Sequence, residues 1–161
     1  MTTSLLHAVT AALLVASRAT ATPPDPCALL TKAEAEAILG KPIPPPSQGG
    51  SGECHYGEEG SSDEIIVYQM MLMFKSNEEF HAYLVKDTEE TNARMKEELG
   101  KAGATVKETT VDPVPGVGES AYYVDPSLLV LKNSRVLNIV AADRKQAVAV
   151  AAKVLPRFGS P

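Results

Sequence analysis

The residues of this chain that could perform chemistry are few and lie far apart in the sequence. Beyond the N-terminal segment there are two histidines, His55 and His81, and neither has a cysteine, histidine or carboxylate at zinc-ligand spacing. Residues 58–64 (EEGSSDE) carry four carboxylates, whose oxygens suit calcium, but they lack the D-x-D-x-D-G order of a calcium loop. We therefore predict no metal ligand and no cofactor.

A glycine-rich stretch at residues 116–121 (GVGESA) has only a superficial likeness to catalytic loops. It lacks the Lys-Ser/Thr pair of a P-loop and opens no helix, and Ala121 and Tyr122 follow Ser120 where a nucleophile elbow has x-G. We predict a turn into a strand, no catalytic residue and no enzyme. A small hydrolase, in which His55, Ser120 and a carboxylate meet only in three dimensions, is the alternative.

Cys27 and Cys54 are the only two cysteines in the chain. In an exported protein an even number of cysteines predicts disulfide bonding, and two cysteines allow a single intramolecular pairing. In the chain-entropy model, closing residues 27–54 contributes about 3.5 kcal/mol to stability. A lipid-anchored Cys27 is the weaker interpretation, because Asp25 and Pro26 precede it where a lipoprotein needs small or aliphatic residues.

The N-terminal segment predicts export. Residues 5–16 (LLHAVTAALLVA) form an apolar run too short to span a bilayer, which needs about 20 residues. Ala19-Thr20-Ala21 then has the A-x-A form of a signal-peptidase site. We expect a signal peptide at residues 1–21, cleaved after Ala21, and a single domain over residues 22–161. The product is secreted or periplasmic in the cell envelope, without a stable membrane anchor; a buried or disordered N-terminal helix is the alternative.

Composition narrows the choice of partners. The chain has 161 residues, 44 % hydrophobic and 22 % charged, which suits one soluble globular domain. Its net charge of −5 repels nucleic-acid phosphates and anionic membranes. Aromatic residues make up 5 % and tryptophan is absent, which argues against a stacking platform for sugars or single-stranded nucleic acid.

Residues 65–74 (IIVYQMMLMF) give the strongest strand pattern, and the pattern is apolar on both faces. A strand of this kind is usually central and covered on both sides. We therefore expect its methionines to pack in the core. The alternative is that one face is an interface on which the methionines form an adaptable binding surface.

Capping and turn signals predict the other elements. A capping box at Thr31 and Glu34 starts a helix over residues 31–39, with Leu30, Ala33, Ala37 and Ile38 facing inward. A helix over residues 77–99 has one narrow apolar stripe: Phe80, Leu84, Thr88, Thr91, Met95 and Leu99. Asn133-Ser134 is a two-residue hairpin loop. The remaining elements are a loop at 41–52, strands at 53–57, 105–111, 119–124, 128–132 and 135–142, and a helix from the Asp143 cap to Phe158.

The order α-β-β-α-β-β-β-β-α predicts an α+β fold. Consecutive strands and hairpins favour a mainly antiparallel sheet with helices packed on one face, rather than a doubly wound sheet.

Several short motifs together resemble a known family. They are Asp25-Pro26-Cys27-Ala28-Leu29-Leu30-Thr31, Gly40, Cys54, and residues 115–122 (PGVGESAY). The chain resembles small exported bacterial domains of unknown function, found in actinobacteria as secreted proteins or lipoproteins and similar to the extracellular sensor domains of some receptor kinases. It lacks the lipobox cysteine of the lipoprotein members. The resemblance implies no activity and no catalytic residue.

We thus predict an exported, non-enzymatic binding or interaction module whose ligand is an unknown protein or small molecule. Its expected surface is the Met-rich strand or the cleft between sheet and long helix. The alternatives are the small extracytoplasmic hydrolase and a structural envelope protein that forms a stable homo-oligomer.

Overall fold

The structure, a computed structural model, describes residues 25–159 apart from positions 51 and 102, so the predicted signal peptide lies outside the described residues. The strands are β1 (Ser47–Gln48), β2 (Cys54–Tyr56), β3 (Ile65–Met73), β4 (Asp112–Pro113), β5 (Ser120–Val124), β6 (Ser127–Lys132) and β7 (Arg135–Val140). The helices are α1 (Pro26–Leu29), α2 (Lys32–Leu39), α3 (Asn77–Lys101) and α4 (Arg144–Val154).

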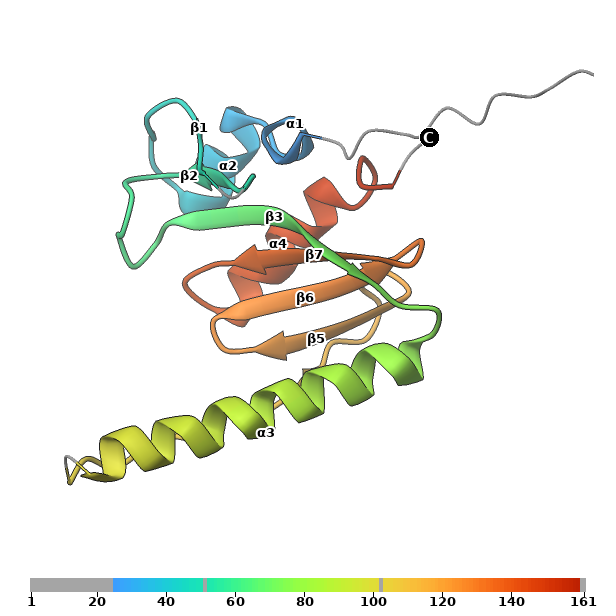
Figure 1. Cartoon of the computed structure of the whole chain (residues 1–161). Coiled ribbons are helices and arrows are strands. Elements are labelled where there is room, and N and C mark those ends of the chain that lie inside the picture. Colours follow the sequence, from blue (N-terminus) through green and yellow to red (C-terminus); the bar gives the residue numbers. More distant parts are fainter. Residues whose placement is uncertain (1–24, 51, 102, 160–161) are drawn as a thin grey trace, which may run out of the picture.

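The strands form one seven-stranded sheet in the order β1-β2-β3-β7-β6-β5-β4 (Figure 1). Every pairing in it is antiparallel, which confirms the predicted α+β fold with a mainly antiparallel sheet. The sheet has an N-terminal half, β1 to β3, and a C-terminal half, β4 to β7, and within each half consecutive strands are neighbours. In the described sheet the two halves meet where β3 pairs with β7, two strands separated in sequence by α3 and three further strands.

Alternation along the strands divides the core into two parts. On one face, which we call the α4 face, side chains of β6 and β7 such as Val130 and Leu137 pack with α4, α1 and α2. On the opposite face, which we call the α3 face, Leu131 and Val136 pack with Phe80 and Leu84 of α3. Helices α1, α2 and α4 therefore share one face, whereas α3 packs on the other, so the prediction of helices on one face only is wrong for α3.

Helix α3 covers only part of its face. Its predicted stripe is buried at Phe80, Leu84 and Thr88, but Leu99 is exposed. The helix has 25 residues and so measures about 37 Å, whereas the strands beside it span about 20 Å. Its second half therefore extends past the sheet (Figure 1), and part of the α3 face over β2 and β3 has no helix on it.

The prediction of a strand over residues 105–111 is wrong. Residues 104–111 are irregular, and the strand that follows is only β4. The side-chain amide of Asn92 explains the difference, because its Oδ1 accepts from the Thr109 N–H (3.0 Å) and its Nδ2 donates to the Thr109 carbonyl (2.8 Å). Backbone groups that a strand would give to its neighbour are thus satisfied by a helix side chain.

The predicted caps and hairpin are confirmed. Thr31 and Glu34 form the capping box of α2, and Asp143 caps α4 through the Gln146 N–H. Asn133 and Ser134 both have left-handed φ angles, 52° and 61°, which suit a two-residue turn between twisted strands.

The predicted inward face of α2 is wrong in part. Ala35 is buried, whereas Ala33 and Ala37 are exposed. Helix α2 packs against α4, and Glu34 beside Ala35 reaches Arg157, just beyond the end of α4. The orientation of α2 therefore follows this contact with α4.

The glycine-rich stretch is a turn into β5, as predicted. Gly118 has a φ of 62°, and a Cβ there would lie 2.4 Å from Val130 Cγ1 and 2.9 Å from the Leu131 carbonyl oxygen. The next residue, Glu119, accepts the Asn133 N–H at 2.9 Å and so caps the β6–β7 turn. The motif is structural at these positions.

We predict that Gly118→Ala lowers the free energy of unfolding by about 2–4 kcal/mol, because it combines an unfavourable φ with a clash against the backbone of β6. Gly116→Ala is the matched control: its φ is 79°, but nothing lies within 4 Å of the added Cβ. Its expected cost is about 1 kcal/mol. Urea unfolding measures both, and equal costs would contradict this role for Gly118.

A second prediction concerns Glu34, to which Arg157 donates two hydrogen bonds of 2.8 and 2.9 Å. These bonds, with the Thr31 N–H, lower the pKa of Glu34 from 4.5 to about 2. A lowered folded-state pKa adds stability that is present above pH 4.5 and is lost as the pH falls towards 2. Glu34→Gln should cost about 1 kcal/mol at pH 7, given solvent screening, and flatten the pH dependence in that window. Urea unfolding at several pH values checks this, with the exposed Glu98→Gln as a control that leaves the profile unchanged.

Candidate functional site

The most prominent concavity is a hollow of about 560 Å³ on the uncovered part of the α3 face. It lies over β2, β3 and β7, away from α3 itself. Its walls are mostly apolar, with a polar group at one end, and its lining contains no Lys or Arg. The principal side chains are Glu53, His55, Ile66, Tyr68, Met70, Leu72 and Val140.

Cross-strand register explains how these residues meet. His55 lies opposite Ile66, and Ile66 lies opposite Val140, so one row of side chains crosses three strands on one face. Tyr68, Met70 and Leu72 continue that face along β3, and Glu53 stands two residues before His55.

The prediction that the β3 methionines pack in the core is wrong for two of them. Met71 is fully exposed (101 %) and Met73 is 71 % exposed, while Met70 is partly buried beside the α3-face core. The first half of β3 is covered, since Ile65 and Val67 are completely buried. In the second half, Met70 and Leu72 pack partly against the α3-face core, whereas Met71 and Met73 have no cover.

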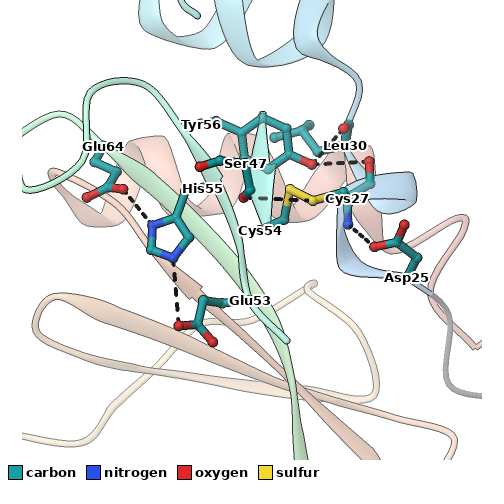
Figure 2. Close-up of a disulfide and its surroundings, with 9 residues drawn as sticks. All are labelled: Asp25, Cys27, Leu30, Ser47, Glu53, Cys54, His55, Tyr56 and Glu64. Carbon is teal, nitrogen blue, oxygen red and sulfur yellow. Dashed lines mark hydrogen bonds and ion pairs between the residues drawn. A yellow bond between two sulfur atoms is a disulfide. The ribbon is translucent and has the colours of Figure 1, made fainter. Parts of the chain in front are cut away.

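His55 is the only sequence-predicted candidate in the hollow, and the structure places it between two carboxylates (Figure 2). Its Nδ1 lies 2.6 Å from Glu64 Oε1, and the second Glu64 oxygen accepts the Gly60 N–H at 2.9 Å. Because a carboxylate only accepts, Nδ1 carries the hydrogen and Nε2 of the neutral ring is an acceptor. Nε2 lies 3.8 Å from Glu53 Oε1, which is too far for a hydrogen bond.

When the His55 ring is neutral, two acceptors stand side by side at this end of the hollow, Nε2 of His55 and the carboxylate of Glu53. The Glu64 side chain, 8 % exposed, sits behind His55 and fixes its ring. A ligand group with several N–H donors, such as an ammonium or guanidinium, could bridge the two acceptors.

A second polar pair lies along the hollow. The Asn138 side-chain amide donates to the Tyr68 hydroxyl oxygen at 2.6 Å, while Asn138 Oδ1 is buried without a partner among the described residues. The amide fixes the position of the phenol. The hydroxyl hydrogen of Tyr68 has no acceptor among the described hydrogen bonds, so it is available to a ligand.

The predicted disulfide between Cys27 and Cys54 is present, with the two Cα atoms 5.0 Å apart (Figure 2). It joins α1 to β2 immediately before His55. The neighbouring Tyr56 is completely buried and donates to the Leu30 carbonyl at 2.7 Å, and burial raises the pKa of this phenol to about 12. These two links hold the short β2 strand and therefore set the position of His55 and Glu53.

The other sequence candidates lie elsewhere. Ser120 begins β5, four strand spacings from β2, or roughly 19 Å, so it does not meet His55. His81 is on the exposed side of α3, where its ring stacks on Tyr122 at 4.8 Å. The structure therefore does not bring His55 and Ser120 together.

The carboxylates of the acidic turn point to different partners. Asp63 pairs with Lys41 and accepts from Ser61, whereas Glu64 contacts His55. The hydrogen bond from Lys41 lowers the pKa of Asp63. Among the described residues no group of three or more His, Cys, Asp or Glu side chains is placed to hold a metal ion.

No protein-family model, curated protein or solved structure matches this chain. Sequence reasoning singled out His55 and the Met-rich strand but missed Glu53 and Tyr68, although the i, i+2 spacing of Glu53 and His55 on one strand does place them on one face.

One further observation concerns membranes. Within residues 25–159, leaving aside positions 51 and 102, no helix has both the length and the apolarity needed to cross a bilayer.

The disulfide gives a third prediction. Without reduction, neither cysteine should be alkylated, and intact mass spectrometry should show two alkylations only after reduction. Reduction should lower the free energy of unfolding by about 3.5 kcal/mol, because the open loop regains chain entropy when unfolded. Alkylation of the folded protein before reduction would disprove the bridge.

Proposed function

We propose that this protein is an exported, non-enzymatic binding domain and that the hollow beside the second half of β3 is its binding site. The observation that carries the proposal is the full exposure of Met71, which borders the hollow, on a strand where Met73 is also strongly exposed. Isolated exposed apolar residues are ordinary, but a contiguous apolar strand bordering a concave site is typical of an interaction surface.

The chemistry of the hollow supports binding more than catalysis. His55 has a carboxylate at Nδ1 as an orienting partner, and among the described hydrogen bonds neither ring nitrogen is paired with a hydroxyl or thiol to activate. The flexible, polarizable side chains of Met70 and Met71 suit a surface that adapts to its ligand. A disulfide fits an exported protein, and this supports the extracellular or envelope location.

The first test is a thermal-shift screen of the purified oxidised protein against divalent metals, fatty acids, oligosaccharides and ten-residue peptides. A ligand present at about 1,000 times its Kd stabilises the fold by roughly 4 kcal/mol, or about 10 °C for a domain of this size. The proposal expects a shift from at least one ligand class.

A fourth prediction locates the site. Met71→Lys should leave the melting temperature of the free protein within about 2 °C, because the side chain is fully exposed. It should abolish the shift caused by any ligand that the screen finds, since it places a charge on the apolar border of the hollow. Leu99→Lys, at the exposed end of α3, is the matched control and should keep the full shift.

Two outcomes would overturn the proposal. Equal ligand shifts in Met71→Lys and wild type would place binding elsewhere. A flat screen together with a stable homo-oligomer in light scattering would favour the structural envelope protein instead.

A further inference from the structure

The second half of β3 is an open edge of the sheet. Strand β2 pairs with β3 only from Ile65 to Val67, and β1 pairs only with β2. On its other side β3 pairs with β7 from Ile66 to Met73, with a register shift between Met70 and Met73. Among the described residues, no strand pairs with residues 68–73 on the β2 side.

This edge lacks most of the features by which proteins protect their edge strands. Natural edges carry lysines, prolines or inward-pointing charges, or are covered by a helix or loop. Residues 68–73 (YQMMLM) contain no charge, proline or glycine, and Met71 and Met73 are exposed beside them. The register shift on the β7 side is the only irregularity.

Backbone alternation shows which groups face outward. The Glu53 carbonyl accepts the Gly49 N–H, so the polar backbone groups of Glu53 point to the β1 side. Those of the next residue, Cys54, then point to its partner Val67 on β3. Two residues further along β3, and before the register shift, the N–H and C=O of Gln69 therefore point to the open edge, and Met71 follows within the register shift.

We propose that the ligand of this site is an extended peptide that adds as a strand to the open edge of β3 and carries a lysine or arginine opposite Glu53. This deepens the proposed function and rests on it. Main-chain hydrogen bonds to Gln69 and Met71 supply affinity, and alternate apolar side chains of the peptide enter the hollow beside Tyr68 and Met70. The peptide cation bridges Nε2 of His55 and the Glu53 carboxylate, the two acceptors that stand 3.8 Å apart without a described donor.

Charge favours a foreign peptide over a second copy of this chain. The hollow contains Glu53, with Glu64 behind His55, and no Lys or Arg, so its complement is cationic. Residues 65–74, which a second copy would present, contain no cation. Self-pairing of two β3 edges would thus leave Glu53 unmatched.

The test uses synthetic ten-residue peptides in which Val or Leu alternates with Thr and one terminal position is Lys, Gln or Glu. Amide hydrogen exchange, followed by NMR, reads each backbone group of the full protein. In the free protein the Tyr68 and Met70 amides should already exchange slowly because they face β7, while those of Gln69 and Met71 exchange fast. The Lys peptide should slow amide hydrogen exchange at Gln69 and Met71 by at least about ten-fold. Binding without this protection overturns strand addition.

Methylation of the peptide backbone is the matched control on the ligand. Two series carry N-methyl groups on alternate residues, one set facing β3 and the other facing solvent. One series should lose binding by more than about 30-fold and the other should keep it within about 3-fold, because only one set of N–H groups pairs with β3. Equal effects of both series contradict the proposal.

The cation is tested separately. The Lys peptide should bind about ten-fold more tightly than the Glu peptide, and Glu53→Gln should reduce that preference by about five-fold, a change typical of a partly exposed charge pair. Glu89→Gln, on the exposed part of α3, should leave the preference unchanged. No preference in the wild type overturns the assignment of the cation.

The proposed binding site and the proposed strand addition can be contradicted separately. If fatty acids or sugars shift the melting temperature through Met71 but no peptide protects Gln69 and Met71, the binding site stands and strand addition is wrong. If the amides of Gln69 and Met71 become protected from exchange as the protein concentration rises without any peptide, a second copy of the chain occupies the edge. The proposal of a peptide ligand is then wrong. If no probe binds, both proposals fall.

Discussion

The pairing of β3 with β7 is the constraint on which the rest of the structure depends. It is the only seam between the N-terminal strands β1, β2 and β3 and the C-terminal strands β7, β6, β5 and β4. Because β7 comes late in the chain, this seam joins two strands that are separated in sequence by α3 and three further strands, and it sets which side chains share each face. The row from His55 through Ile66 to Val140 exists only because of this register.

The seam also explains why the site is left open. Strand β3 is nine residues long, whereas its partner β2 has only three. The helices of the α4 face cover the buried first half of β3, and α3 begins beyond its end and runs across β5 and β6. The second half of β3 is therefore apolar but only partly covered, and the exposure of Met71 and Met73 results from a mismatch of lengths rather than from a special residue.

The polar end of the hollow is built from local links that reinforce one another. The disulfide and the Tyr56 hydroxyl fasten β2 to α1, and Glu64, held by the Gly60 N–H, fixes the ring of His55. Orienting His55 in this way leaves its second nitrogen facing the hollow beside Glu53. The proposed site thus has a polar end fixed by side-chain contacts and a border of flexible methionines, a division that suits the proposed peptide with one cation and a variable apolar chain.

The sequence by itself determined what depends on neighbours along the chain. The capping box at Thr31, the Asp143 cap, the Asn133-Ser134 turn, the long α3 and the single cysteine pairing all follow from local chemistry, and together they predict an α+β fold. Tertiary structure decided what depends on distant partners. Asn92 takes the backbone hydrogen bonds of Thr109 and so prevents a strand, α2 is oriented by its contact with α4, and the exposure of Met71 could not be predicted from the apolar pattern of β3. An apolar pattern indicates that burial would stabilise a strand, whereas the lengths and positions of the neighbouring elements decide whether the strand is buried.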